Sequence, residues 1–404
     1  MNCKTALTIV SMFVLSNMYA QQPNSPKFGK GLFNLIGKDS TWSMKIGARM
    51  QFLTTAEWDS NKDGLHNPTS SMLVRRARLK FDGFAFSPKL KYKLELGLSN
   101  RDIGKASSVT NDAPRYILDA VVKWNFYENF ELWVGQTKLP GNRERVISSG
   151  NLQQVDRSLL NSRFNIDRDM GFQLRHHFNL SNQFIIREAL SFSQGEGRNI
   201  TTGNLGGHQY TGRLEFLPFG KFTSKGDYSG SDLKFEEKSK LSIGVTYDYN
   251  NNAVKNRSNQ GSYMLIDNDG EIENSNVFKS NISTLFIDAM YKYKGFSFMG
   301  EYADRSADKT SYVNSEGDTK YVQVGNSLNL QAGYLLSKTL EVSGRYTNVD
   351  WDKAIGKSTE NQYTLGVSKY IAGHKLKVQT DISYLDLASS TNELMYRLQV
   401  DIHF

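Results

Sequence analysis

The sequence predicts an all-β protein: a transmembrane antiparallel β-barrel of about 16 strands, with a constriction loop folded into its lumen. Segments of about ten residues alternate apolar and polar side chains along most of the chain. Short and long connections alternate between these segments, as expected for a barrel with one short-turn rim and one loop-bearing rim. The final segment places apolar residues at alternate positions from Leu394 to Phe404, so the chain ends on an aromatic residue at the rim of a closed wall. No internal run approaches the roughly 20 apolar residues that a membrane helix needs.

Residues 1–20 have the features of a secretory signal peptide. Lys4 precedes an apolar run, and Ala20 offers the small residue that suits cleavage before Gln21. Cys3 is the single cysteine of the 404-residue chain, so we expect the mature protein to contain no disulfide or thiolate metal site. We divide the chain into this signal peptide, a short lead at 21–40 and one barrel at 41–404, and expect export to a Gram-negative outer membrane.

Each predicted strand has an apolar face and a polar face. In the clearest one, Ala77, Leu79 and Phe81 alternate with Arg78 and Lys80. The predicted strands lie near 41–54, 76–83, 90–98, 118–126, 130–137, 170–179, 183–192, 208–217, 240–250, 282–293, 295–304, 327–337, 339–349, 361–371, 374–386 and 393–404.

Residues 59–68 are rich in turn formers and predict a loop between the first two strands. Asp59, Asn61, Asp63 and Gly64 match the first half of a calcium-binding loop, but Ser70 stands where a bidentate Glu belongs, which favours an ordinary hairpin loop. We therefore predict no metal site there.

The regular alternation stops at 139–169. Five arginines lie in this stretch among four acidic residues, and a connection this long inside a sheet protein is usually functional. We predict that it folds into the lumen as the constriction loop, either as an anion trap or as a rigid, self-paired barrier. Its arginines are Arg143, Arg145, Arg157, Arg163 and Arg168.

The basic residues of the strands must face the lumen if the barrel lies in a membrane. Each Arg or Lys turned to lipid at mid-membrane costs about 2–4 kcal/mol, and the pleat fixes which residues share a face. The predicted pore-lining residues are Lys45, Arg49, Arg76, Arg78, Lys80, Lys91, Lys93 and Arg397. Because the last strand closes onto the first, Arg397 is expected near Lys45 and Arg49. Such a basic wall favours anions, although the same charges could simply solvate a porin wall beside their acidic neighbours.

Several stretches resemble the porin O and P family of bacterial outer-membrane channels, described as phosphate-selective. The matching stretches are Arg75-Arg-Ala-Arg-Leu-Lys-Phe81, Glu95-Leu-Gly-Leu-Ser-Asn-Arg101, Val134-Gly-Gln-Thr-Lys-Leu-Pro-Gly-Asn-Arg-Glu-Arg-Val146, Asp156-Arg-Ser-Leu159, Asn161-Ser-Arg-Phe-Asn-Ile-Asp-Arg-Asp169, Gly212-Arg-Leu-Glu-Phe-Leu-Pro-Phe-Gly-Lys-Phe222 and Gly226-Asp-Tyr228. The resemblance implies a sixteen-stranded barrel, a homotrimer, a constriction loop after an early strand and a line of arginines that leads anions inward.

The sequence therefore predicts a passive porin for small hydrophilic solutes with a preference for anions, in which phosphate selectivity and general anion selectivity both stay open. Outer-membrane lipid and small anionic solutes are the expected partners, and diffusion requires no cofactor. The net charge of +8 does not by itself indicate nucleic acid, and no hydrolase or phosphate-loop motif supports an enzyme. The main alternative is a surface-binding or adhesion barrel without an open pore, which would carry no current.

Overall fold

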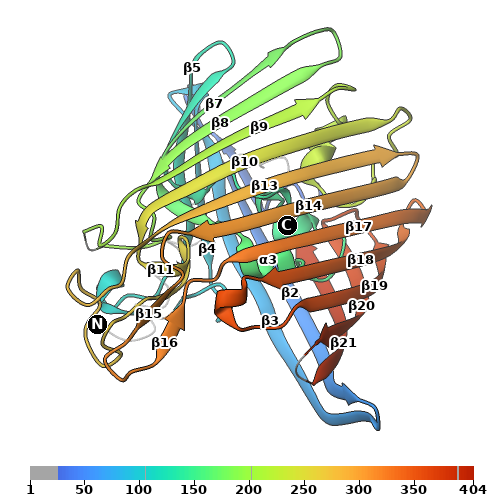
Figure 1. The fold of residues 1–404 in the computed structure, drawn as a ribbon. Coiled ribbons are helices and arrows are strands. Elements are labelled where there is room, and N and C mark those ends of the chain that lie inside the picture. The colour runs from blue at the N-terminus through green and yellow to red at the C-terminus, as the bar shows by residue number, and fades with distance from the viewer. Residues whose placement is uncertain (1–25, 105, 202, 389–390) are drawn as a thin grey trace, which may run out of the picture.

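Sixteen antiparallel strands close into a barrel in the computed structural model, which describes residues 26–404 except 105, 202 and 389–390 (Figure 1). Each strand pairs with the next, and the last pairs with the first. The predicted fold class is thereby confirmed. The signal peptide predicted at 1–20 lies outside the described residues. Among the residues that are described, no helix is long and apolar enough to cross a membrane.

The wall consists of β2 to β10 and seven later strands. Their bounds are β2 Trp42–Asn61, β3 Gly64–Ala85, β4 Ser87–Gly97, β5 Ile117–Tyr127, β6 Phe130–Lys138, β7 Arg168–Asn179, β8 Ile185–Ser193, β9 Gln209–Leu217, β10 Lys240–Ala253, β13 Ser280–Tyr293, β14 Phe296–Ala307, β17 Gly325–Ser337, β18 Leu340–Trp351, β19 Glu360–Tyr370, β20 Leu376–Leu387 and β21 Asn392–His403. A further short strand, β1 Phe33–Ile36, lies in the lead predicted at 21–40 and pairs with β2 beyond the end of β21.

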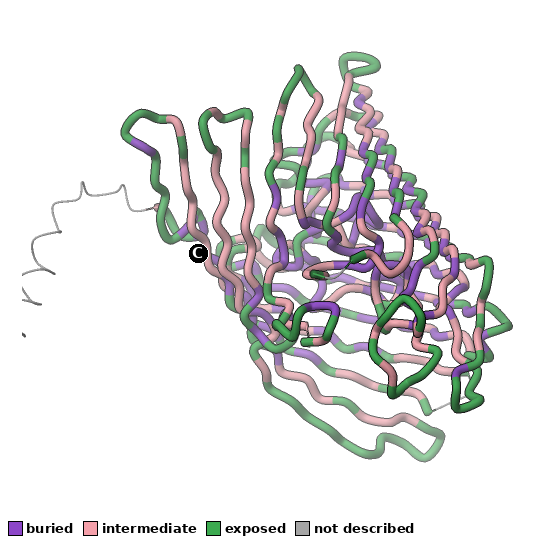
Figure 2. Tube along the Cα trace, turned by 90° about the vertical axis from the view of Figure 1, so that its left-hand side faces the viewer, coloured by how far each residue is buried: buried purple, intermediate pink, exposed green. Residues whose placement is uncertain are grey.

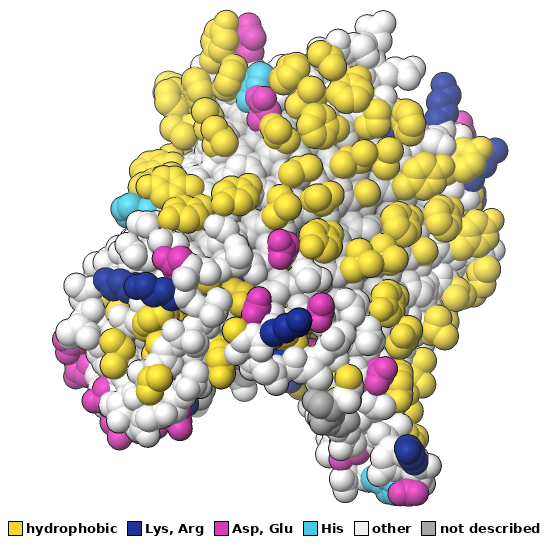
Figure 3. Space-filling view, in the orientation of Figure 1, with side chains coloured by type: hydrophobic (Ala, Val, Ile, Leu, Met, Phe, Trp, Pro, Cys, Tyr) yellow, Lys and Arg dark blue, Asp and Glu magenta, His cyan; other side chains and the backbone are white. Residues whose placement is uncertain are grey.

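Lipid-facing positions carry the apolar half of each strand pattern. Phe52, Trp124, Leu365 and Val400 are all exposed, on strands spread around the wall. Hydrophobic side chains cover much of the wall in Figure 3, whereas charged side chains gather mainly toward the rims. This distribution is what a barrel in lipid requires, because charged groups at mid-membrane depth are costly.

The loop predicted at 59–68 is instead mostly strand, which corrects that prediction. β2 continues to Asn61 and β3 begins at Gly64, so that only Lys62 and Asp63 form the turn. The resulting hairpin projects at the bottom of Figure 1. Asp59 accepts a hydrogen bond from Asn67 at 2.7 Å, and the described residues contain no cluster of three His, Cys, Asp or Glu side chains that could hold a metal.

The two rims differ as predicted. Turns such as Lys294-Gly295 are short at one rim, whereas longer loops at the other contain the hairpins β11 Lys255–Arg257 with β12 Gln260–Tyr263, and β15 Ser311–Val313 with β16 Thr319–Tyr321. The short-turn rim has one exception. Since β9 ends at Leu217 and β10 begins at Lys240, 22 residues (218–239) connect them, and we call this segment the inner insert.

Two segments fill part of the lumen, where buried residues gather in Figure 2. One is the constriction loop, which contains helices α2 Arg143–Val146 and α3 Leu159–Phe164. The other is the inner insert, which includes the 3-10 helix η3 Thr223–Tyr228. The two segments meet where the Gly230 amide donates to the Asn151 carbonyl at 2.7 Å.

Candidate functional site: a basic cavity beside the constriction loop

Helix α3 packs on the inner face of β14, β17 and β18 through an apolar cluster. Phe164 is fully buried, and its ring centroid lies 5.5 Å from that of Trp351. Ile282 and Phe286, which point inward from β13, belong to the same cluster. Arg305 donates to the carbonyl of Phe164 at the end of α3, which satisfies a carbonyl that a helix terminus leaves unpaired.

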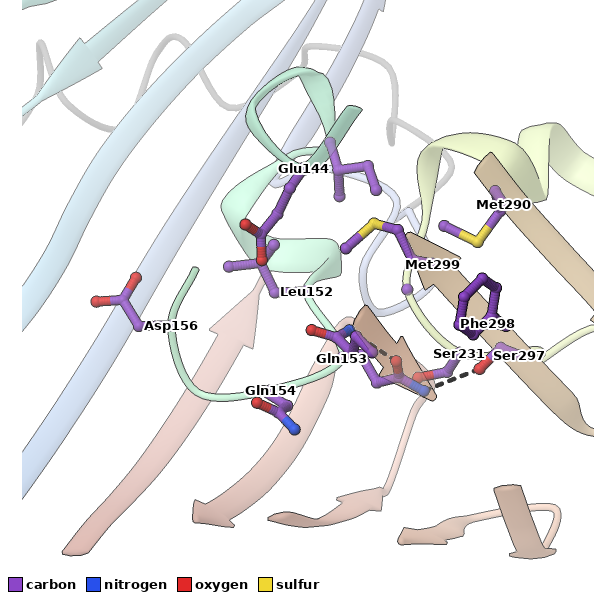
Figure 4. A pocket seen from close by; sticks show the side chains of 13 residues that line it. Glu144, Leu152, Gln153, Gln154, Asp156, Ser231, Met290, Ser297, Phe298 and Met299 are labelled. Carbon is purple, nitrogen blue, oxygen red and sulfur yellow. Dashed lines mark hydrogen bonds between the residues drawn. The ribbon is translucent and has the colours of Figure 1, made fainter. Parts of the chain in front are cut away.

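The next part of the loop is fixed by polar contacts to the wall. The Gln153 amide nitrogen donates to Ser297 at 2.8 Å and to Glu341 at 2.7 Å, and Lys377 donates to the Leu152 carbonyl. Figure 4 shows Gln153 and Ser297 beside a void of ≈ 10 Å³, about the smallest space that holds one water. This void, between the constriction loop and β13, β14 and β17, is too small for a solute.

A much larger cavity lies on the opposite side of the constriction loop, against the β3–β7 wall. Its volume is ≈ 350 Å³. Its lining includes eleven basic and only two acidic side chains, and we call it the basic cavity. The basic residues are Arg75, Arg76, Arg78, Arg101, Arg115, Lys138, Arg145, Arg157, Arg168, Arg198 and Lys255, and the acidic ones are Asp102 and Asp167.

Some of these cations are neutralised by carboxylates. Arg78 pairs with Asp102 at 2.6 Å and with Glu95 at 3.1 Å, and Arg168 pairs with Asp119 at 3.2 Å. Such pairs hold side chains in place on the wall and reduce the local field.

Other cations donate only to carbonyl oxygens and have no carboxylate within ion-pair distance among the described residues. Lys138 donates to the carbonyls of Arg145 at 2.6 Å and Ile147 at 3.1 Å. Arg157 donates to the carbonyls of Glu144 and Ile147. Burial, together with the Arg145 guanidinium, lowers the pKa of Arg157 to about 9, which still leaves it charged at neutral pH.

Three buried nitrogens around this cavity have no hydrogen-bond partner among the described residues: Arg76 Nε, Arg115 Nε and Arg198 Nη1. Arg76 is only 4% exposed. A buried donor without a partner is costly, so these nitrogens are available to water or to an anion that enters the cavity.

A family model described as phosphate-selective porin O and P matches residues 45–401. The chain belongs to this porin family. It is 24% identical over 365 residues to an uncharacterized protein of Aquifex aeolicus (strain VF5), covering 83% of this chain and 81% of that protein.

Two solved structures share the fold of this porin. An anion-selective porin from Comamonas acidovorans matches with a TM-score of 0.53 at 13% identity, over 90% of this chain and all of that one. The trimer form of OmpT of Vibrio cholerae, folded in vitro, matches with a TM-score of 0.50 at 12% identity, over 89% of this chain and 99% of that one. The porin fold and family place this protein in a Gram-negative outer membrane.

The porin brings together five of the predicted site residues in the basic cavity: Arg76, Arg78, Arg145, Arg157 and Arg168. Arg168 is the first residue of β7 rather than part of the loop, which corrects the predicted loop boundary. Lys80, Lys91 and Lys93 lie together with Lys123 in a second cavity of ≈ 370 Å³ nearer the short-turn rim, which we call the lysine cavity.

The remaining predicted residues line neither cavity. Arg49 pairs with Asp401 at 2.8 Å, Arg397 with Asp381 at 2.7 Å and Arg163 with Glu360 at 2.8 Å. Arg143 is fully buried and pairs with Asp288 at 2.7 Å, so it attaches the constriction loop to the wall. Lys45 is half-buried on β2, opposite Asn34 of β1.

The expected grouping of Arg397 with Lys45 and Arg49 is wrong. Arg397 is opposite Thr55, whereas Arg49 is opposite His403, because β21 is displaced along β2. The shear of a closed barrel sets this displacement, and the sequence pattern does not report it.

Six cavity residues were missed: Arg75, Arg101, Arg115, Lys138, Arg198 and Lys255. Arg75 follows Val74 at a bulge, where Gln51 pairs with Arg76 and Phe52 with Val74, so two consecutive arginines line the cavity. A bulge breaks strict alternation. The other five residues lie on loops or at strand ends, where no period exists to assign a face.

Proposed function

We propose that this outer-membrane porin is a passive channel that prefers small hydrophilic anions, phosphate among them. The observation that carries the proposal is the lining of the basic cavity, with eleven cations against two acids. Rings of Arg and Lys favour anions in pores, and Arg adds paired hydrogen bonds to phosphate or carboxylate oxygens.

The proposed path continues along β3. Arg76, Arg78 and Lys80 are successive inward positions on that strand, the first two in the basic cavity and the third in the lysine cavity. Between the cavities lies a network in which Lys93 pairs with Glu95 at 2.7 Å and with Asp119 at 2.8 Å. An anion could therefore pass from one set of cations to the next without crossing the apolar side of the lumen.

The homotrimer also belongs to this proposal. Its support is the family membership and the shared fold with a porin whose structure is a trimer.

Channel recording in planar bilayers tests the function. We expect stepwise conductance, and a reversal potential in a KCl gradient that favours chloride over potassium. Phosphate added at millimolar concentration should reduce the chloride current if phosphate shares the path. Complete absence of conductance would support the alternative barrel without a pore, and a cation-favouring reversal potential would refute the anion preference.

A further inference from the structure

The inner insert (218–239) folds back into the lumen, unlike the short turns at the same rim. Several contacts hold it inside the barrel: Tyr228 donates to Glu215 at 2.6 Å, Asp227 pairs with Arg187, and Ser231 donates to Glu341 at 2.6 Å. Long connections in compact proteins are usually functional.

A third cavity, of ≈ 600 Å³, lies between the insert and the inner faces of β6 to β9. The insert contributes Lys221, Phe222, Lys225 and Tyr228 to its lining. The volume falls within the range of small-molecule sites, which typically combine aromatic surfaces with a few polar groups. We call it the aromatic cavity.

Its central feature is the stack of Arg175 on Trp133. Glu131 and Arg175 are directly opposite each other on β6 and β7, yet no ion pair among the described residues joins them. Glu131 instead accepts from Trp133 Nε1 at 2.8 Å, and the guanidinium carbon of Arg175 lies 4.1 Å from the Trp133 ring centroid. The Arg175 guanidinium donates to Gln173 Oε1 through Nε at 3.1 Å and through Nη2 at 2.7 Å.

Arg175 thus has no carboxylate partner within 4 Å among the described residues, and its positively charged guanidinium lies over the Trp133 ring. Lys123 reaches the same ring from β5, on the other side of β6, and its nitrogen lies over the ring 3.5 Å from the centroid. The two faces of the indole are thus covered by Lys123 and Arg175, and the outer face of the Arg175 guanidinium is the flat surface that can meet a ligand. Aromatic rings bind to such surfaces by stacking and by cation–π attraction.

The insert supplies cations at the mouth of the cavity. Lys221 and Lys225 are exposed, and neither has a carboxylate partner within the described part of the chain. Of the three acids in its lining, Glu131 accepts from Trp133 Nε1 and Glu215 pairs with Arg213 at 2.8 Å. Glu188 is on the outer face of β8 with Leu190 and contacts His176 at 2.9 Å. The cavity consequently offers a flat guanidinium surface, backed by Trp133, together with unneutralised positive charge.

We propose that the aromatic cavity binds small aromatic carboxylates, with the ring against the Arg175 guanidinium that Trp133 supports and the carboxylate toward Lys221 or Lys225. Inorganic phosphate has no ring to stack on the Arg175 guanidinium, so this site differs in chemistry and in place from the basic cavity. The proposal does not depend on the anion preference of the channel, because binding here can be measured without current.

Equilibrium dialysis of the purified full-length porin in detergent against benzoate tests the proposal. Cyclohexanecarboxylate serves as the matched probe, with the same charge and nearly the same size but no aromatic ring. We expect saturable benzoate binding at one site per chain, and at least fivefold weaker binding of cyclohexanecarboxylate.

Two variants locate the site. W133L should weaken benzoate binding about tenfold, and K221Q/K225Q should weaken it at least threefold, whereas the control W124L alters an exposed tryptophan on the lipid face and should bind as the unmodified protein does. If W133L does not fold, W133F takes its place with K221Q/K225Q, and W133F should retain binding. Equal binding of the two probes, or unchanged binding in K221Q/K225Q, would overturn the proposal.

Discussion

Neutralising three arginines of the basic cavity should weaken its anion preference. Arg101, Arg115 and Arg198 line the cavity from segments outside the strands, so the triple variant R101Q/R115Q/R198Q should leave the barrel wall intact. Each substitution removes a positive charge and retains a hydrogen-bonding side chain.

The magnitude follows from the size of the cavity. A sphere of ≈ 350 Å³ has a radius of about 4 Å, and the lining charges lie about 7 Å from its centre once atomic radii are added. One charge at that distance contributes about 0.6 kcal/mol in water and about 0.3 kcal/mol after screening at 0.1 M salt. Three charges give about 0.9 kcal/mol, or about fivefold in ion concentration. Because the anion concentration in the cavity falls about fivefold while the cation concentration rises by the same factor, the anion-to-cation permeability ratio should decrease by about 20-fold.

Reversal potentials in KCl gradients near 0.1 M measure this ratio. The control variant K38Q/K89Q/K353Q removes the same net charge from exposed lysines that line neither the basic nor the lysine cavity, and it should retain the original selectivity. The effect should shrink at 1 M salt, where the Debye length is about 3 Å. A change of less than twofold in the cavity variant, or an equal change in the control, would refute the electrostatic reasoning.

Three further predictions concern how the constriction loop is held. F164A removes a buried ring that packs on Trp351 and should lower the free energy of unfolding by about 3–5 kcal/mol, measured by denaturant titration against the lipid-facing control L365A. R305M leaves the carbonyl at the end of α3 without its donor and should cost about 1–3 kcal/mol in the same titration. K138M removes the hydrogen bonds that hold residues 145–147 to β6, so we expect greater open-channel noise, and a trace as quiet as that of the unmodified porin would contradict this role.

The positions of the wall strands could be predicted because lipid outside and water inside impose a period of two. The parts of β2 and β3 next to their connecting turn were missed because this pattern is absent from them. Around Asp59 and His66 the hairpin is polar on both faces, so the hydrogen-bonded ladder continues where no apolar alternation marks it. The apolar alternation therefore marks the part of a strand that lies in the membrane, and it does not show how far the strand extends beyond the membrane.

The side of the constriction loop that each arginine faces could not be predicted. Arg143 and Arg145 are two residues apart, yet Arg143 is buried against Asp288 while Arg145 lines the basic cavity and pairs with Asp167. In an irregular loop the direction of a side chain is set by tertiary contacts rather than by spacing. The sequence could predict that several loop arginines reach the lumen, but not which ones.

The location of the basic cavity within the lumen nevertheless follows from a signal that the strand pattern contains. On β13, Ile282, Phe286 and Met290 point inward and are at most 2% exposed, while Ile287 on the outer face is 43% exposed. A strand that presents large apolar side chains on its inner face as well as its outer one does not border open water there, because such surface is stable only when another segment covers it. The neighbouring strands must therefore receive the constriction loop. A water-filled path then belongs on the opposite wall, where β3 presents Arg76, Arg78 and Lys80 at successive inward positions.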